Sequence, residues 1–141
     1  MDKKKVVVLK GDETGQELLE ESLRVLQPEV IRTQELEFEY FDLSLENRRV
    51  THNQVVREAA ERLKVTGLGI KAATITPSNP DDVGSPNALL REWINGQVIL
   101  RTGRRIPGVR PLAGVHAPIA VVRMAVEDAY NAKEWREGEG E

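Results

Sequence analysis

The chain has 141 residues, a length typical of one domain, with 40% hydrophobic residues and a net charge of −3. Its 20 basic and 23 acidic residues are nearly balanced, which argues against a nucleic-acid surface, since such a surface needs clustered excess positive charge. The sequence contains no cysteine, which excludes disulfides, thiolate metal sites and cysteine nucleophiles. Its two histidines, His52 and His116, are too far apart for a paired-histidine zinc motif.

The apolar runs of the sequence are all short. The charged start of the chain is followed by only four apolar residues, 6–9, which is too short for a signal peptide. No run approaches the roughly 20 apolar residues that span a bilayer. We therefore expect a cytoplasmic protein without membrane or nucleic-acid partners.

The first half of the chain predicts two strands, each followed by a helix. Residues 6–9 form a β-branched run typical of a strand buried on both faces, and residues 36–40 alternate as in a half-buried strand. Capping boxes at residues 14–17 and 51–54 predict where the helices begin, and Pro28 is expected to end the first. The expected apolar stripes are Leu18, Leu19, Leu23 and Leu26 on the first helix, and Val55, Val56, Ala59, Ala60 and Leu63 on the second.

The second half predicts three strands and one helix. Residues 69–75, 98–100 and 119–122 are expected to be strands, the last two fully buried. Ser85 at the N-cap and Pro86 at the first helical position predict a helix. Residues 102–118 form a long connection, typical of a functional loop or of a crossing between two lobes. The alternation of elements predicts an α/β fold, a three-layer, open, mostly parallel sheet with flanking helices.

The most informative polar residues surround the helix that begins at Ser85. Ser85 and Asn87 lie at its start, where free backbone amides and the helix dipole attract anions, and Arg91 projects from the same face as Asn87. Arg101 and Arg123 end the next two strands, and ligands collect at strand ends in an open α/β sheet. Three arginines would suit a tricarboxylate, because guanidinium groups bind carboxylates in bidentate geometry. The alternative is that Ser85 only caps the helix and that the arginines are solvated.

Two other features give weaker signals. Gly11 and Gly15 flank a strand-to-helix turn that matches no phosphate-loop pattern, so a plain turn is the simpler interpretation. Lys71, Thr74 and Thr76 lie at the end of a predicted strand, which alone is weak evidence for a site.

An ordered series of segments covers nearly the whole chain. Its members are DLSLENR at 42–48, GIKAATITP at 69–77, SPN at 85–87 with Arg91, VILR at 98–101, IPG at 106–108, and Val122-Arg123 followed by Asp128, Tyr130 and Trp135. The series resembles the isocitrate/isopropylmalate dehydrogenase family of decarboxylating 2-hydroxy-acid dehydrogenases. Within that family it is closest to the isocitrate dehydrogenases of the eukaryotic NADP type. The order of the segments is specific, whereas no single segment would be.

The resemblance implies a substrate site made of residues that spacing had already selected. Ser85, Asn87 and Arg91 would bind carboxylates of isocitrate or a similar polycarboxylate. Arg101 and Arg123 would add two further guanidinium groups.

The resemblance also implies a catalytic residue and cofactor contacts. Tyr130 would act in proton transfer to the decarboxylated enol. Thr76, and less directly Lys71 and Thr74, would contact the substrate and the nicotinamide side of NADP or NAD. The family reaction also needs Mg²⁺ or Mn²⁺, whose ligands match nothing in this sequence.

Proteins of the family are several hundred residues long, so the fold is expected to be incomplete. Residues 1–102 would be the N-terminal part of the large α/β domain, and residues 103–141 the connection and the start of the small domain. We therefore expect a homodimer, or association with the missing C-terminal half, and self-association through exposed apolar edges. Two departures from the eukaryotic type are the absence of a basic residue at 78–84 and the methionine at Met124 in place of a histidine.

The expected function is NAD(P)-dependent oxidative decarboxylation of isocitrate to 2-oxoglutarate, with this chain supplying the substrate-carboxylate site. The chain alone is expected to be inactive. One alternative is a non-catalytic module that binds a polycarboxylate or a dehydrogenase subunit. The other is a sibling dehydrogenase for isopropylmalate, homoisocitrate or tartrate. The polar Ser85 and Asn87 count against a substrate with an apolar substituent.

Overall fold

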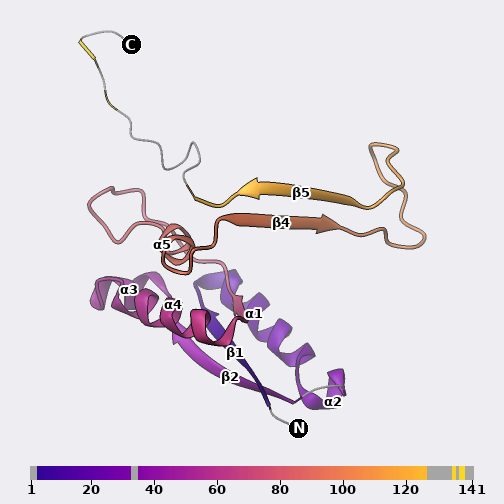
Figure 1. Ribbon diagram of the computed structural model, residues 1–141, viewed down its shortest axis with the longest axis horizontal. Helices are drawn as coiled ribbons and strands as arrows, with labels where there is room; N and C mark the ends of the chain where they lie inside the picture. Colours follow the sequence, from indigo (N-terminus) through magenta and orange to yellow (C-terminus); the bar gives the residue numbers. More distant parts are fainter. Residues whose placement is uncertain (1–2, 33–34, 127–134, 136, 139–141) are drawn as a thin grey trace. The chain divides into compact units, whose positions relative to one another are not determined.

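The computed structural model describes residues 3–32, 35–126, 135 and 137–138, and its contacts divide the chain into two units, Met1–Asn95 and Gly96–Glu141. Figure 1 shows the helices and strands of each unit. The boundary at residue 102 that the resemblance implies belongs to a larger fold and stays a prediction. None of the helices in this described part of the chain is long and apolar enough to cross a membrane.

The first unit is built on a three-stranded parallel sheet in the order β2-β1-β3. The central strand β1 (Lys4–Lys10) pairs along its whole length with β2 (Leu36–Asp42), and near its end with β3 (Gly69–Lys71). Val7 and Val8 project from opposite faces of β1 and both are fully buried, so the predicted two-sided burial of this strand is confirmed.

Strand β3 ends at Lys71, earlier than the predicted residue 75. Instead, the residues after Lys71 form backbone hydrogen bonds with the end of β1 and with the turn that follows it. The backbone N–H of Ala72 donates to the carbonyl oxygen of Leu9 at 2.9 Å, and that of Asp12 donates to the carbonyl oxygen of Ala73 at 3.0 Å. The segment after β3 therefore lies against the turn between β1 and the first helix.

Helices cover both faces of the sheet (Figure 1). On one face, α1 (Glu13–Val25) packs Leu19 against Val8. On the other face, α4 (Gln54–Thr66) and α5 (Pro86–Trp93) share a core cluster that contains Val7, Leu9, Leu43, Val55, Val56, Ala59, Ala60 and Leu90. The short helices α2 (Pro28–Ile31) and α3 (Leu45–Val50) lie in the two crossovers. The predicted α/β fold class, with a parallel sheet between helices, is confirmed.

Neither predicted capping box forms. Helix α1 begins after Asp12, which makes no side-chain cap hydrogen bond. The hydroxyl of Thr51 donates to the carbonyl oxygen of Asn47 at 2.7 Å, and α4 begins after Asn53, whose φ of 62° is left-handed. Leu18 is 66% exposed and so lies outside the apolar stripe predicted for α1.

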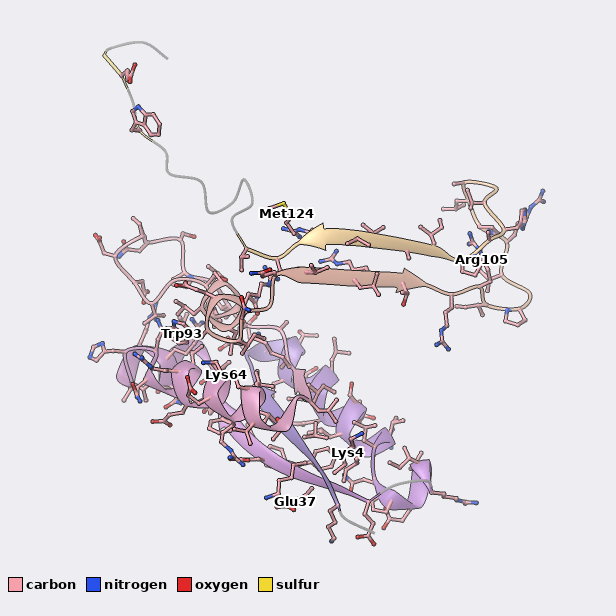
Figure 2. All side chains as sticks on the ribbon, in the orientation of Figure 1. Lys4, Glu37, Lys64, Trp93, Arg105 and Met124 are labelled. Atoms are coloured by element: carbon pink, nitrogen blue, oxygen red, sulfur yellow. The ribbon has the colours of Figure 1, made fainter. Side chains whose placement is uncertain are left out.

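The second unit contains an antiparallel ribbon. Strand β4 (Val98–Gly103) pairs with β5 (Ile119–Met124), with Val98 opposite Met124 and Gly103 opposite Ile119. The guanidinium group of Arg105 donates to the carbonyl oxygen of Ala117 at 2.7 and 3.0 Å and closes the connection. Arg105 lies at the loop end of the ribbon and Met124 at the other end (Figure 2). The long connection is thus a hairpin loop between paired strands.

The predicted burial of these last two strands is wrong. Val98 is 66% exposed and Val122 is 70% exposed. The described part of the second unit holds no helix and no third strand that would cover either face of the ribbon. An aliphatic run therefore indicated a strand here but not its burial.

Candidate functional site

The side chain of Asp12 joins the carboxyl ends of the three parallel strands. One carboxylate oxygen accepts a hydrogen bond from the backbone N–H of Leu45, at the start of α3, at 2.8 Å. The other accepts from the backbone N–H of Ile75, beyond the end of β3, also at 2.8 Å. Asp12 thereby fixes two segments that are distant in sequence, because charge-assisted hydrogen bonds of this kind are among the stronger polar contacts.

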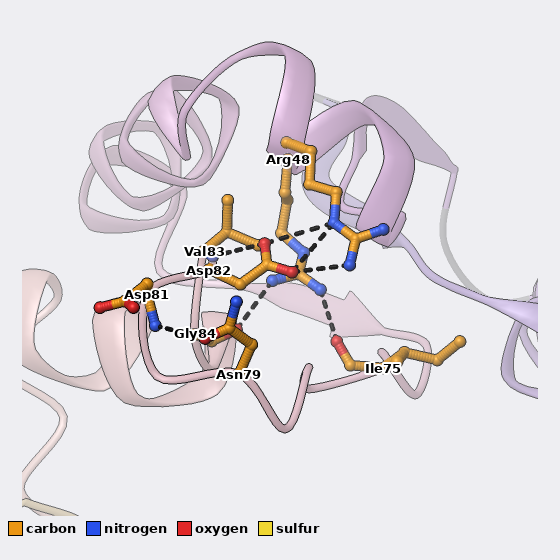
Figure 3. Close-up of polar contacts among 8 residues, drawn as sticks. Arg48, Ile75, Asn79, Asp81, Asp82, Val83 and Gly84 are labelled. Atoms are coloured by element: carbon orange, nitrogen blue, oxygen red, sulfur yellow. Dashed lines mark hydrogen bonds and ion pairs between the residues drawn. The ribbon is translucent and has the colours of Figure 1, made fainter.

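Arg48 of α3 binds three backbone carbonyl groups at the same edge of the sheet. Its side chain is fully buried, and it donates from Nε to Leu43 and from Nη1 to Gly84, each at 3.0 Å. It also donates from Nη2 to the carbonyl oxygen of Ile75. Figure 3 shows the contacts with Ile75 and Gly84. Burial lowers the pKa of Arg48, and the carboxylate of Asp12 acts in the opposite direction.

The middle of the segment 76–84 is held by α3 and by the turn after it. Arg49 pairs with Asp82, with Nη2 at 2.6 Å and Nε at 3.1 Å from the same carboxylate oxygen, and the hydrogen bond from Arg49 lowers the pKa of Asp82. The side-chain amide of Asn53 donates to the carbonyl oxygen of Val83 at 2.7 Å. An open pocket of about 430 Å³ borders these contacts, lined by Arg49, His52, Asn53, Asp81, Asp82 and Val83.

The predicted cofactor residues lie on the first half of the segment after β3. The Nζ of Lys71 donates to the hydroxyl oxygen of Thr74 at 2.9 Å and to the carbonyl oxygen of Ala72 at 2.8 Å. Lys71 and Thr74 are therefore brought together. Thr76 is exposed, and its side chain makes no hydrogen bond within the described residues.

The ammonium group of Lys71 lies in an electropositive, partly buried environment. Burial is the main cause that lowers the pKa of Lys71, to about 8. The positive charges of Arg48 and Arg91 act in the same direction, and the carboxylate of Asp12 opposes them. Because Arg91 contributes, the charged end of α5 lies within electrostatic range of the end of β3.

The first turns of α5 carry the predicted carboxylate-binding residues of this unit. Ser85 is the N-cap residue, and its hydroxyl makes no cap hydrogen bond. Pro86 and Leu90 are buried and anchor one side of the helix, which leaves Asn87 and Arg91 on another side. Among the described residues, no hydrogen bond occupies the side chains of Ser85, Asn87 or Arg91.

Arg101 and Arg123 belong to the ribbon of the second unit. Ile99 pairs with Arg123 and Arg101 pairs with Val121, so the two arginines lie on the same face as diagonal neighbours. Tyr130, the predicted catalytic residue, lies outside the described residues. That all three arginines act on one substrate stays a prediction.

The two glycines of the first strand-to-helix turn are required by packing. A Cβ atom on Gly11 would overlap the carbonyl oxygen of Ala73 and would lie 2.8 Å from the Cβ of Ala72. A Cβ atom on Gly15 would lie 2.7 Å from both the Cβ and the carbonyl oxygen of Ala73. The glycines thus allow the segment after β3 to approach α1, which supports the simpler interpretation of a plain turn.

Sequence reasoning did not identify Asp12 or Arg48 as organising residues. Asp12 was assigned to a turn, and Arg48 appeared only as the last residue of the segment 42–48. Nothing in the spacing of charged residues indicates that an arginine is buried. The one available signal for Arg48 is that it ends the segment DLSLENR, residues 42–48, of the ordered series that carries the family resemblance.

No metal centre can be assembled from the residues that the structure describes. They contain no group of three or more histidine, cysteine, aspartate or glutamate side chains placed to hold an ion. Asp82, which lies in a turn with Asp81, is paired with Arg49.

The first unit is that of an α/β protein, with a parallel sheet between helices and with Lys71 and Thr74 together at the end of β3. The chain belongs to the isocitrate/isopropylmalate dehydrogenase family, whose sequence model matches residues 5–141.

Curated relatives are NADP isocitrate dehydrogenases. The mitochondrial protein of Aspergillus niger is 35% identical over 92% of this chain and 27% of its own length. The mitochondrial protein of Saccharomyces cerevisiae is 32% identical over 92% of this chain and 32% of its own length. The protein of Sphingobium yanoikuyae is 35% identical over 72% of this chain. The chain thus spans about a third or less of the length of these relatives.

Proposed function

We propose that this chain forms the substrate-carboxylate part of an NADP-dependent isocitrate dehydrogenase. The observation that carries the proposal is the start of α5, where Ser85, Asn87 and Arg91 have side chains that no hydrogen bond within the described residues occupies. The relatives named as NADP isocitrate dehydrogenases support the choice of substrate and cofactor. The proposed reaction oxidises the 2-hydroxyl group of isocitrate and releases carbon dioxide to give 2-oxoglutarate.

The charges around β3 and α5 favour a polyanionic ligand. Burial and the neighbouring cations lower the pKa of Lys71, so the folded chain holds positive charge there at an energetic cost. A carboxylate that approached Lys71 and Arg91 would relieve this repulsion. The amides at the start of α5 would add neutral donors and a favourable dipole.

We assign Arg101 and Arg123 to further carboxylate groups of the same substrate. Their position on one face of the ribbon, as diagonal neighbours, supports a joint role. Arginine is suited to it, because its planar guanidinium group binds a carboxylate through two parallel hydrogen bonds. A tricarboxylate has a group for each of the three arginines.

NADP, when bound, would accept the hydride that leaves the 2-hydroxyl carbon. The exposed hydroxyl of Thr76 is suited to hydrogen bond the nicotinamide end, whereas Lys71 and Thr74 are already paired and would support that strand end. Proton transfer by Tyr130 is a further part of the proposal. The described residues contain no group placed to hold a metal ion, so the metal that this reaction uses is assigned to none of them.

Titration of the ¹⁵N-labelled chain with isocitrate, with and without magnesium, tests the proposal. We expect amide shifts that cluster at Ser85–Arg91, at Arg101 and at Arg123. The variant Arg91→Met should lose the shifts at α5, because it keeps an unbranched apolar stem but removes the guanidinium group. Isopropylmalate and tartrate should bind more weakly than isocitrate if the site reads three carboxylates.

The absence of any shift at millimolar isocitrate would contradict the proposed carboxylate site. An assay of NADP⁺ reduction with magnesium then bears on the alternative of a non-catalytic binding module. Reduction by this chain would exclude that alternative, whereas binding without reduction is the expected result for a chain that supplies only the carboxylate site.

A further inference from the structure

We propose that Arg48 is a positioning residue that sets the two ends of the segment 75–84 and, through them, the start of α5. The inference rests on the proposed function, because its consequence is measured on isocitrate binding. Arg48 itself is fully buried and contacts backbone rather than any position expected for the substrate.

The contacts of Arg48 select the two ends of this segment. Its Nη2 donates to the carbonyl oxygen of Ile75, directly before Thr76, and its Nη1 donates to that of Gly84, directly before Ser85. The third donor, Nε, binds Leu43 after the end of β2. One rigid guanidinium group therefore joins the end of β2 to both ends of this segment. Figure 3 shows its contacts with the two ends, at Ile75 and Gly84. The residue expected to contact the cofactor, Thr76, follows the first end, and the expected substrate residue Ser85 follows the second.

The first end of the segment, at Ile75, has a second anchor. The N–H of Ile75 donates to Asp12 at 2.8 Å, so both backbone polar groups of Ile75 are held by buried or half-buried charged side chains. At the other end, Arg48 is the one described partner of the carbonyl oxygen of Gly84, and Asn53 holds the preceding carbonyl oxygen, that of Val83. Arg48 is thus placed to determine the direction in which the chain enters α5.

A lysine cannot replace this arrangement. Its ammonium group is a single point, whereas the three carbonyl groups lie in three separate segments that the planar guanidinium group reaches with three different nitrogen atoms. We therefore expect Arg48→Lys to misplace Ser85 and Asn87 while the charge is kept. A misplacement of this kind is expected to weaken isocitrate binding by about tenfold or more.

Isocitrate titration of four ¹⁵N-labelled chains tests the inference: the unmodified chain, Arg48→Lys, Leu19→Ala and Arg24→Lys. Leu19→Ala removes a buried side chain on the opposite face of the sheet and controls for lost stability alone. Arg24→Lys makes the same chemical exchange at an exposed arginine. In the free Arg48→Lys chain we expect amide shifts around Leu43 and position 48, where a contact is lost and the residue is changed, and across residues 75–87. We expect only this variant to lose affinity, the controls staying within about twofold.

The outcomes separate the two proposals. If the unmodified chain does not bind isocitrate, the proposed function fails and the positioning role falls with it. If it binds and Arg48→Lys binds equally well, or if Leu19→Ala loses as much affinity, only the positioning role is overturned. If Arg48→Lys does not fold, hydrogen exchange at the Arg48 Nε–H of the unmodified chain decides: isocitrate should slow it, and unchanged exchange would overturn the inference.

Discussion

The turn between β1 and α1 offers a test of the packing argument in which two effects have opposite signs. Gly11 does not adopt a left-handed backbone. If backbone freedom were the only effect, replacing Gly11 with alanine would stabilise the protein by about 0.4–1 kcal/mol, because the unfolded chain would have less freedom to lose. The structure predicts the reverse. A Cβ atom at this position would overlap the carbonyl oxygen of Ala73 and would lie 2.8 Å from the Cβ of Ala72.

The expected magnitude follows from what has to move. Forcing extra atoms into a well-packed site costs about 1–3 kcal/mol, and the obstacle here is backbone, which cannot rotate away. Because a backbone atom is overlapped, we take the upper end of this range, about 3 kcal/mol, and subtract the entropic gain of up to about 1 kcal/mol. We therefore expect Gly11→Ala to lower the free energy of unfolding by about 2 kcal/mol. That is a large part of the roughly 5–15 kcal/mol that is typical of a domain.

Urea unfolding followed by amide signals of the first unit measures this difference. The matched variant is Gly69→Ala, where a new Cβ would overlap only the terminal Cδ2 methyl of Leu63, a flexible side chain, and would lie 3.1 Å from the carbonyl oxygen of Val7. We expect the loss at Gly69 to be smaller than that at Gly11. A Gly11→Ala chain as stable as the unmodified chain, or more stable, would refute the view that close approach of the segment after β3 requires this glycine.

Three further changes test other parts of the structure. Leu90→Ala should cost about 2–5 kcal/mol in urea unfolding, because Leu90 is buried in the core cluster, and unchanged stability would contradict that packing. The unfolding free energy should rise with pH between about 8 and 10.5, because in this range the folded chain has released the proton of Lys71 that the unfolded chain still binds. Lys71→Met should flatten this rise, and an equal slope in both chains would contradict the prediction. Val122→Lys should reduce self-association in sedimentation velocity, since Val122 is 70% exposed, and an unchanged sedimentation coefficient would show that this face is not involved.

Local sequence patterns predicted the sheet of the first unit but not its connections. Val7 and Val8 lie in a β-branched run, and such a run is typical of a central parallel strand because both of its faces meet apolar helices. The capping box at 51–54 failed because its side chains have other partners: Thr51 donates to Asn47 and Gln54 donates to Glu58. The box at 14–17 failed because α1 begins earlier, after Asp12, whose carboxylate binds Leu45 and Ile75 rather than its own helix. Spacing rules consider neighbours in sequence and cannot register a hydrogen bond across 63 positions.

Only part of the candidate site could be predicted, because spacing rules consider only neighbours in sequence. Residues on one helix can be placed on a common face from their spacing, as Asn87 and Arg91 were. The burial of Arg48 depends on three carbonyl groups in three segments, and no local pattern encodes that. The exposed faces of β4 and β5 likewise depend on which layers cover them, and an aliphatic composition does not specify this.

Proton uptake links the electrostatics of the first unit to the proposed ligand. With a pKa of about 8, Lys71 is about half protonated at pH 8, held there by burial and by the charges of Arg48 and Arg91. A carboxylate near this group favours the charged form, so isocitrate binding should raise the pKa of Lys71 and take up as much as about half a proton at pH 8. Affinity should therefore weaken as the pH rises above 8.

Calorimetric titration at pH 8 in two buffers of different ionisation enthalpy measures this uptake. The Lys71→Met chain is the control, because it keeps a side chain of similar length and lacks the titrating amine, and its binding heat should not depend on the buffer. Binding that releases protons, or that exchanges none in either chain, would show that no carboxylate of isocitrate approaches Lys71. In that case α5 would bind isocitrate without help from the end of β3, and the end of β3 would contact only the cofactor.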